Sequence, residues 1–400
     1  MPPNILWIVT TQWRAQACGY AGDADARTTF MDGLAKIGVA FTEAVTPHPF
    51  GPFARAALLT GVPSPENGIR DYFDPLPAGS RTIAHDMNDL GYESAFFGKW
   101  HLARRESQAR LVGEEHARMV VPPASRGGFR FWEGFESGFL LNDPWLHGTR
   151  LPAPVRFPGY QSDVVCRRAL EVLEGLRSPW FAIVSLEAPH PPYDEPAAGV
   201  APRDPARLSL RGNVPDDPAV MARARRELSG YHAHIEATDR AMGALIGALP
   251  GDTHVVATSV HGDMHGSHGL FRKGWPHEES VRVPLVVRVP GRARKDSAPV
   301  SLLDLPRLAL GWAREIGPFE LPREKVARIS MPSVVELPDQ CDRVWAGLRT
   351  AERKLVLDGS GRPWLFYDLE RDPLETRNLA ADPSHSAEIG RLSQWVTRRP

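Results

Sequence analysis

The hydrophobic positions along this chain form short continuous runs, and segments with helical spacing lie between them. The first run, NILWIVT at 4–10, is apolar and β-branched and predicts a strand that is buried on both faces. Similar runs predict strands at 39–44, 93–97, 180–186, 254–260 and 284–289. Helical periodicity predicts helices at 29–37, 83–90, 162–176, 220–249 and 301–313. Strands that alternate with helices in this way predict an α/β fold with a large, mostly parallel sheet covered on both faces.

The pattern changes near residue 317, where two short apolar runs, 344–348 and 354–357, precede a final helical segment near 386–396. We therefore expect an α/β domain over 1–316 and a small C-terminal α+β subdomain over 317–400, with an antiparallel sheet and a terminal helix. The segment 103–156 is irregular, and no helices or strands are assigned to it, whereas 194–217 is rich in proline and is interpreted as a loop. The stretches 103–160 and 194–217 are expected to cover the pocket, and the Trp and Phe residues of the first indicate a ligand with an apolar or ring portion.

Composition narrows the function classes. The chain is 42% hydrophobic and 24% charged, with a net charge of −1, which is typical of a globular protein and gives no reason to expect nucleic acid or a membrane as partner. Three widely spaced cysteines argue against a disulfide scaffold, and no apolar run approaches the roughly 18 residues of a membrane helix. No signal peptide is evident, so the expectation is a cytoplasmic protein. A homo-oligomer is left open.

Six sequence segments carry a family resemblance. They are NILWIVTTQWRAQACGYAG at 4–22, PFGPFARAALLTG at 49–61, GKWHL at 98–102, PHPPY at 189–193, HGDMHGSHGLFRKGWPHEESVRVPLVVRVPG at 261–291 and FYDLERDPLETRNLA at 366–380. In this order and at these intervals they resemble the type I sulfatases of the alkaline-phosphatase-like superfamily. The resemblance implies a three-layer sandwich and an active site that acts on sulfate esters.

The catalytic parts of that family are incomplete in this chain. The family uses a Cys four positions before the conserved Arg, oxidised to formylglycine, as nucleophile; here the position is Gly51, which offers no side chain. The family holds a divalent metal with an Asp pair after the first strand and a later Asp followed by His or Asn. Here these positions are Thr11, Gln12 and Val260, and only His261 remains. We therefore expect neither a bound metal nor another cofactor.

The anion-binding positions of the family are intact. The resemblance places Arg55, Lys99, His101, His190 and Lys273 where the sulfate oxygens and the leaving group are held, with His261 beside them. Cations without their usual carboxylates and metal predict an excess of positive charge that binds sulfate, phosphate or carboxylate. We expect lowered pKa values for the lysines if they are buried, and a catalytic acid–base role for His101 and His190. The alternatives are a surface ion pair for Arg55, solvated loop positions for Lys99 and His101, a strand cap for His190 and a surface position for Lys273.

Other residues near these motifs receive simpler interpretations. His261, His265 and His268 invite a zinc site, but the glycines between them argue against a shared helical face. For His48 and His265 a solvated loop position is favoured over an acid–base role. Cys18 is interpreted as packed rather than reactive.

Three functions follow, in order of preference. The first is a repurposed, metal-independent enzyme that promotes elimination or substitution of sulfate or phosphate on a small anionic metabolite. The second is a non-catalytic, sulfatase-like binding or partner protein. The third is a residual hydrolase with Thr11 or Thr46 as nucleophile.

Overall fold

The computed structural model describes residues 2–315 and 326–397. A ten-stranded sheet forms its centre, in the order β11-β2-β10-β9-β1-β8-β4-β5-β6-β7. The middle strands β9 (His254–Ser259), β1 (Ile5–Thr10), β8 (Trp180–Ser185), β4 (Glu93–Lys99) and β5 (Phe131–Phe135) run parallel. The expected α/β fold with a large, mostly parallel sheet is therefore confirmed.

Strand β1 shows why this sheet lies between two helical layers. All six of its residues are buried, and successive side chains point to opposite faces. Ile5, Trp7 and Val9 pack into one hydrophobic cluster, while Leu6 and Ile8 pack into the other. A strand with two apolar faces requires cover on both sides.

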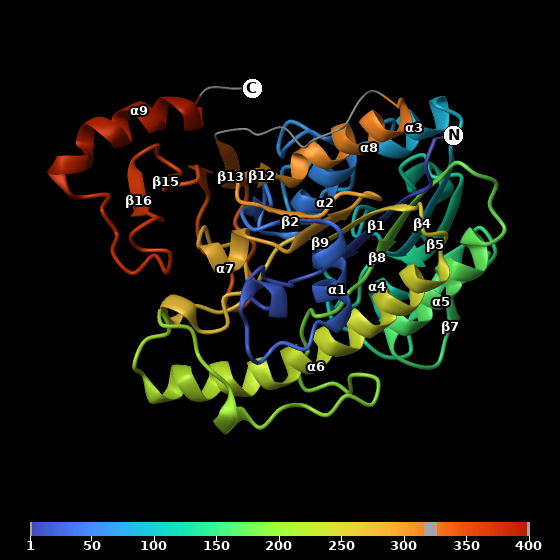
Figure 1. Cartoon of the computed structure of the whole chain (residues 1–400), viewed down its shortest axis with the longest axis horizontal. Coiled ribbons are helices and arrows are strands. Elements are labelled where there is room, and N and C mark those ends of the chain that lie inside the picture. The colour runs from blue at the N-terminus through green and yellow to red at the C-terminus, as the bar shows by residue number, and fades with distance from the viewer. Residues whose placement is uncertain (1, 316–325, 398–400) are drawn as a thin grey trace.

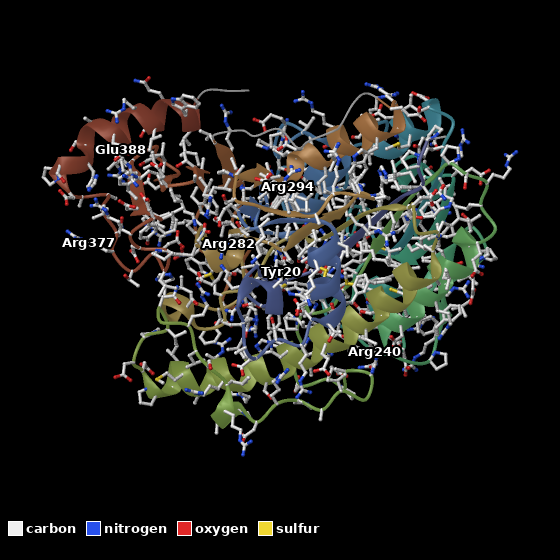
Figure 2. All side chains as sticks on the ribbon, viewed as in Figure 1. Tyr20, Arg240, Arg282, Arg294, Arg377 and Glu388 are labelled. Atoms are coloured by element: carbon white, nitrogen blue, oxygen red, sulfur yellow. The ribbon has the colours of Figure 1, made fainter. Side chains whose placement is uncertain are left out.

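Helices supply that cover. One face carries α1 (Thr29–Ile37), α5 (Gln161–Leu173) and α6 (Pro218–Ala248), and the other carries α2 (Gly51–Thr60), α3 (Ile83–Asp89) and α8 (Leu305–Ala313). In Figure 1, α6 lies along the lower edge of the molecule and α3 and α8 along the upper edge, with the sheet between them. Side chains fill both layers (Figure 2).

The edges of the sheet are antiparallel or short. Strand β10 (Leu285–Arg288) pairs antiparallel with β9 and with β2 (Val39–Phe41), whose other neighbour is β11 (Arg294–Asp296). At the opposite edge, β6 (Trp145–Gly148) and β7 (Val155–Arg156) follow β5. The segment 103–156, to which the sequence assigned no elements, thus contains β5, β6, β7 and the short α4 (Glu114–Ala117). These strands form because β4 offers a free edge, a long-range partner that local periodicity does not reveal.

The small C-terminal part has its own antiparallel sheet. Its four strands are β13 (Ala327–Met331), β14 (Trp345–Arg349), β15 (Arg353–Asp358) and β16 (Pro363–Asp368). Helix α9 (Ser386–Thr397) covers this sheet, as Figure 1 shows at the left of the view. The expected C-terminal sheet and terminal helix are confirmed, and the boundary expected at 316/317 lies outside the described residues.

Three small elements complete the described chain. Strands β3 (Ala44–Val45) and β12 (Val300–Ser301) form a two-stranded sheet, and α7 (Glu278–Val281) joins the main domain to the C-terminal part. Within the described residues no helix has both the length and the apolar character needed to cross a membrane.

Candidate functional site

A cavity of about 780 Å³ lies at the carboxyl ends of the central parallel strands. Strand β1 leads into Thr11 and Gln12, β4 into Lys99 and His101, β8 into the segment 186–190, and β9 into the segment 260–263. Loops after parallel strands meet at one edge of the sheet, where α/β proteins bind their ligands. The cavity wall includes most of the residues that the sequence singled out: Thr11, Gly51, Lys99, His101, His190, His261 and Lys273.

The N-terminus of α2 opens onto this cavity. Gly51 is the first helical residue, and Phe50 before it is extended and provides no side-chain cap. The first N–H groups of a helix lack intrahelical partners, and together with the helix dipole they favour an anion. The motif around Gly51 therefore contributes backbone donors although it contributes no side chain.

Lys99 forms a buried ion pair. Its Nζ donates to Oε1 of Glu187 at 2.6 Å, and both side chains are almost fully buried. The ring of Phe139 lies 4.5 Å from Nζ. Burial lowers the pKa of Lys99 to about 8, although Glu187 opposes the shift. The alternative of a solvated loop position for Lys99 is therefore wrong, and the expected lowering of its pKa is confirmed.

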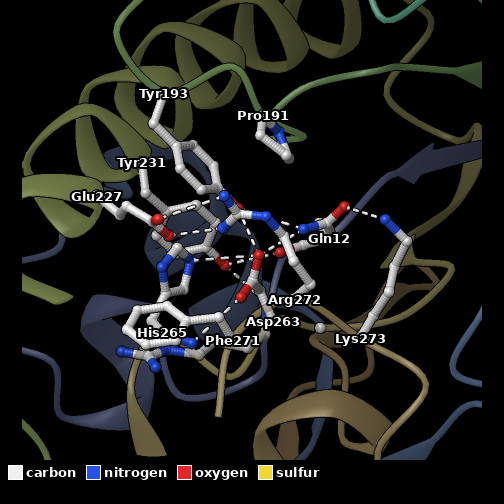
Figure 3. Close-up of polar contacts among 12 residues, drawn as sticks. Gln12, Pro191, Tyr193, Glu227, Tyr231, Asp263, His265, Phe271, Arg272 and Lys273 are labelled. Atoms are coloured by element: carbon white, nitrogen blue, oxygen red, sulfur yellow. Dashed lines mark hydrogen bonds and ion pairs between the residues drawn. The ribbon is translucent and has the colours of Figure 1, made fainter. Parts of the chain in front are cut away.

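Lys273 belongs to a chain of hydrogen bonds that Figure 3 shows. Its Nζ donates to Oε1 of Gln12 at 2.6 Å, and the Gln12 amide nitrogen donates to Asp263. The hydroxyl of Tyr193 donates to the same carboxylate oxygen at 2.5 Å. Burial lowers the pKa of Lys273 to about 7. Gln12 thus links a buried ammonium to a buried carboxylate, and Lys273 is not a surface lysine.

His190 is held as a neutral acceptor beside this chain. Its Nδ1 donates to the carbonyl of Pro191 at 2.7 Å, so its Nε2 accepts from Nζ of Lys273 at 3.1 Å. The imidazole stacks on Phe139 with ring centres 4.4 Å apart. Burial lowers its pKa well below the usual range, and the nearby lysines act in the same direction.

His101 and His261 present buried ring nitrogens to the cavity. Among the described residues, no hydrogen-bond partner is found for either ring nitrogen of His101 or for Nε2 of His261. Both rings are buried, and burial lowers both pKa values well below the usual range. Buried polar atoms are normally satisfied, so these nitrogens indicate a place where a ligand or water completes the site.

Arg55 lies behind the cavity wall. Its guanidinium donates to the carbonyl of Lys99 at 3.1 Å, to Ser185 Oγ at 2.6 Å and to Thr11 Oγ1 at 2.8 Å. Burial lowers its pKa to about 10. It is therefore not part of a surface ion pair, and its direct contact with an anion stays a prediction.

The expected excess of positive charge is smaller than predicted, because the site contains three carboxylates that the sequence interpretation missed. Glu187 faces Lys99, Asp263 faces Lys273 across Gln12, and Oε1 of Glu136 lies 3.5 Å from Arg105 Nε. All three carboxylates are buried. Glu187 and Asp263 follow predicted strands and could have been found, whereas Glu136 follows β5, which the sequence did not predict. These carboxylates offset part of the positive charge of this site before any ligand binds.

Two further histidines differ from expectation. His265 is buried, with its ring centre 4.2 Å from that of Tyr231, and His48 is buried and accepts from the backbone N–H of Ser64 at 2.8 Å. Neither is the solvated loop residue that the sequence favoured, because loops that follow buried strands are themselves covered by α6 or by the C-terminal sheet. Cys18 is packed as expected, and burial raises the pKa of its thiol.

One group of side chains in the described chain could converge on a cation, and it lies outside this cavity. It consists of His268, Glu279 and Glu375. Glu279 already accepts from Arg211 Nε and Asn213 Nδ2, each at 2.8 Å, and Glu375 lies 2.6 Å from the Lys354 ammonium. These protein cations and donors already occupy the carboxylates.

Comparison with known proteins agrees with the geometry. The family profile described as Sulfatase matches residues 3–316. The chain is 30% identical to the ulvan-active sulfatase of Formosa agariphila, over 99% of this chain and 81% of that protein. Its fold is similar to a crystal structure of a putative sulfatase from Bacteroides fragilis, with a TM-score of 0.84 and 23% identity over 99% of this chain and 94% of the other. It is also similar to the phosphonate monoester hydrolase of Agrobacterium radiobacter, with a TM-score of 0.75 and 20% identity over 98% and 94% of the two chains. The chain belongs to the sulfatase family.

Proposed function

We propose that this sulfatase-family protein binds a sulfate or phosphate ester of a small metabolite through lysine, histidine and backbone donors. It promotes elimination or substitution of that group without a divalent metal. The observation that carries the proposal is the chain from Lys273 through Gln12 to Asp263, because it places an ammonium and its counter-charge at the end of β1.

The donor set at the end of β1 and β9 does not fit a divalent cation. The hydroxyl of Thr11 donates to the Leu186 carbonyl at 2.9 Å and accepts from Arg55. The Gln12 oxygen is occupied by Lys273, and Val260 is apolar and buried. Hard cations require several free, preferably charged oxygens, whereas the oxygens of Thr11 and Gln12 are neutral and already bonded. The nearby carboxylate of Asp263 accepts from Gln12 and Tyr193.

The available donors fit an anion. An ammonium group has three N–H donors. Within the described chain, Lys273 uses two of them in hydrogen bonds to Gln12 and His190, so the third can bind an anion. The uncapped N-terminus of α2 and the buried nitrogens of His101 and His261 point to the same cavity. Pre-placed donors of this kind stabilise the charge that develops on a departing sulfate or phosphate.

The cavity also has an apolar side. Phe50, Tyr72, Leu111, Val112 and Phe139 line it. These side chains suit the carbon portion of an ester, in particular a ring that packs against Tyr72 or Phe139.

Binding and turnover are tested separately. In the presence of EDTA, sulfate and phosphate should each raise the melting temperature. At an anion concentration of roughly ten times Kd, the free energy of unfolding should increase by about 1.4 kcal/mol. Lys273→Met and Lys99→Met should lose this effect, while Lys36→Met, at an exposed position, keeps it. Release of 4-nitrophenol from its sulfate and phosphate esters then measures turnover. Stabilisation that persists in both lysine variants, or that requires Mg²⁺ or Ca²⁺, contradicts the proposal.

A binding protein without turnover is the second candidate, because Gly51 supplies no nucleophilic atom. The residual hydrolase with a threonine nucleophile is less well supported. The Thr11 hydroxyl is bonded as described above, and the Thr46 hydroxyl donates to the carbonyl of His48 at 3.0 Å. Anion-dependent stabilisation with no product from either ester is the result expected for the binding protein.

A further inference from the structure

Gly51 and His101 meet at the wall of the cavity. A Cβ atom on Gly51 would lie 2.9 Å from Nδ1 of His101 and 3.2 Å from its Cε1, closer than ordinary carbon contacts. The imidazole therefore stands in the space into which a side chain at position 51 would project. Because Gly51 is the first residue of α2, this space is directly beside the backbone donors that favour an anion.

The position of His101 is imposed by its surroundings. Its backbone adopts a left-handed conformation with φ of 60°, and its N–H donates to the carbonyl of Glu136 at 2.9 Å. The ring of Tyr72 contacts the imidazole edge-on, with centres 5.7 Å apart. A non-glycine residue in this conformation costs free energy, and such strain is concentrated at functional sites.

The imidazole is also in a reactive state. Neither ring nitrogen is hydrogen-bonded within the described chain, and the side chain is only 3% exposed. Burial lowers the pKa of His101 well below the usual range, with Arg105 and Lys99 acting in the same direction. A neutral imidazole carries a lone pair on one ring nitrogen, which is the condition for nucleophilic attack.

We propose that His101 is the nucleophile of this site and accepts the phosphoryl or sulfuryl group of the ester on a ring nitrogen. This inference rests on the proposed function and selects substitution over elimination. It also explains the glycine at position 51, because any larger residue there would displace the ring.

The reaction balances with the groups present. The lone pair of His101 forms a bond to phosphorus or sulfur, the ester bond to that atom breaks, and its electron pair leaves with the alcohol oxygen. That oxygen takes a proton from the ammonium of Lys273. Water then attacks the phosphorus or sulfur, the bond to nitrogen breaks and its electron pair returns to His101, and the proton of the water passes to the amine of Lys273.

The competing side chains are less well placed. Nε2 of His190 accepts from Lys273, and its Nδ1 donates to Pro191. His261 has a buried, unpartnered Nε2 within the described chain, so it is the alternative that the experiment must separate. His261 follows β9, whereas His101 follows β4 and adjoins α2 through Gly51.

The test is a rapid alkaline quench of the whole protein during reaction with 4-nitrophenyl phosphate and, separately, 4-nitrophenyl sulfate. Alkaline conditions preserve a phosphorus–nitrogen bond, and peptide mass spectrometry locates the added group. We expect an adduct on His101 in the wild type, none in His101→Gln, and an unchanged adduct in His385→Gln, which lies in the C-terminal part. Gly51→Ala removes no functional atom, but its methyl group should displace the imidazole and reduce the adduct and kcat at least tenfold.

The opposing outcomes are equally specific. An adduct on His261 or another residue overturns the assignment to His101. Turnover without any adduct at the shortest quench times would contradict the proposal that a residue of this chain is the nucleophile. Anion binding with neither adduct nor product would contradict it as well. Neither of those results contradicts the proposed anion binding. That proposal is contradicted only if sulfate and phosphate fail to stabilise the protein.

Discussion

At the scale of single residues, the protonation of two lysines controls the site. Burial lowers the pKa of Lys273 from 10.5 to about 7 and that of Lys99 to about 8. An ammonium removed from water is costly unless a counter-charge is near, and Glu187 and Asp263 supply only part of that compensation. In the proposed function a bound anion supplies the rest, so anion binding and lysine protonation would be linked.

Sulfate affinity should therefore fall as pH rises. Below pH 7 both ammonium groups are present and affinity is highest. It should weaken by up to about tenfold per pH unit between pH 7 and 8, where one lysine must take up a proton on binding, and by up to about a hundredfold per pH unit between pH 8 and 9, where both must. Isothermal titration calorimetry across this range measures the slope. Lys273→Met should bind more weakly and with a smaller slope, and an unchanged slope would show that this lysine does not carry the effect.

Stability without a ligand should change in the opposite direction. Between about pH 7 and 10.5 the folded protein holds fewer protons on these lysines than the unfolded chain does. The free energy of unfolding attributable to them therefore rises with pH over this window. Urea unfolding of the wild type and of Lys273→Met at pH 7 and pH 9 gives the difference, with Lys36→Met as the matched surface control. If the difference in unfolding free energy between Lys273→Met and the wild type is the same at pH 7 and pH 9, the proposed dependence on lysine protonation is contradicted.

At the scale of elements, the geometry depends on close contact between strand ends. Strand β4 reaches Lys99 through Gly98, where φ is +90° and a Cβ atom would lie 2.1 Å from the carbonyl oxygen of Ser185 on β8. Only glycine allows this backbone conformation together with this approach. The motif GKWHL thus combines a packing requirement at its glycine with the buried ammonium and imidazole on which the proposed function depends.

Gly98→Ala should destabilise the protein by about 2–5 kcal/mol, because a left-handed alanine and an overpacked contact both cost free energy. Gly390→Ala in α9 is the matched control, since a methyl group there meets no described atom within 4 Å. That control should gain about 0.5–1 kcal/mol from helix propensity. Thermal and urea unfolding measure both variants. Equal stability of the Gly98 variant and the wild type would rule out the packing argument.

At the scale of the whole molecule, buried charges join the two parts of the described chain. Lys354 on β15 lies 2.7 Å from Glu278 of the main domain and 2.6 Å from Glu375. The backbone N–H of Glu278 also donates to Glu375 at 2.7 Å. Nearby, Trp345 Nε1 donates to the carbonyl of Gly274 at 2.9 Å, next to Lys273. The C-terminal sheet therefore supports the loop that carries a cavity lysine.

Lys354→Met should cost about 3–5 kcal/mol at pH 8, because it leaves the carboxylate of Glu375 buried without its cation, while Glu278 keeps Arg349 and Arg282. Burial raises the pKa of Glu375 to about 7 even with Lys354 present. A carboxyl group with a raised folded pKa adds stability at low pH and loses it as pH rises, so the penalty should shrink at pH 5. Urea unfolding at both pH values tests this. Arg81→Met, which removes an exposed ion pair with Asp89, should change little at either pH.

Much of the fold was predictable from local pattern. The continuous apolar run of β1 and the helical spacing of α6 each reflect burial imposed on a single segment. Strand β5 was missed because its sequence, FWEGF, forms a strand only by pairing with β4. The site residues Lys99, His101, His190 and Lys273 were placed by motif order, whereas the carboxylates that balance them were not.

The sequence by itself determined the family, the α/β architecture and the absence of a side chain at position 51, because motifs and periodicity are properties of short segments. Only the tertiary structure decided where the charges stand relative to one another. It placed Glu187 against Lys99, connected Lys273 to Asp263 through Gln12, and set His101 into the space beside Gly51. Electrostatic balance and steric exclusion depend on distances across the sheet, and these distances exist only once strands far apart in the chain have come together.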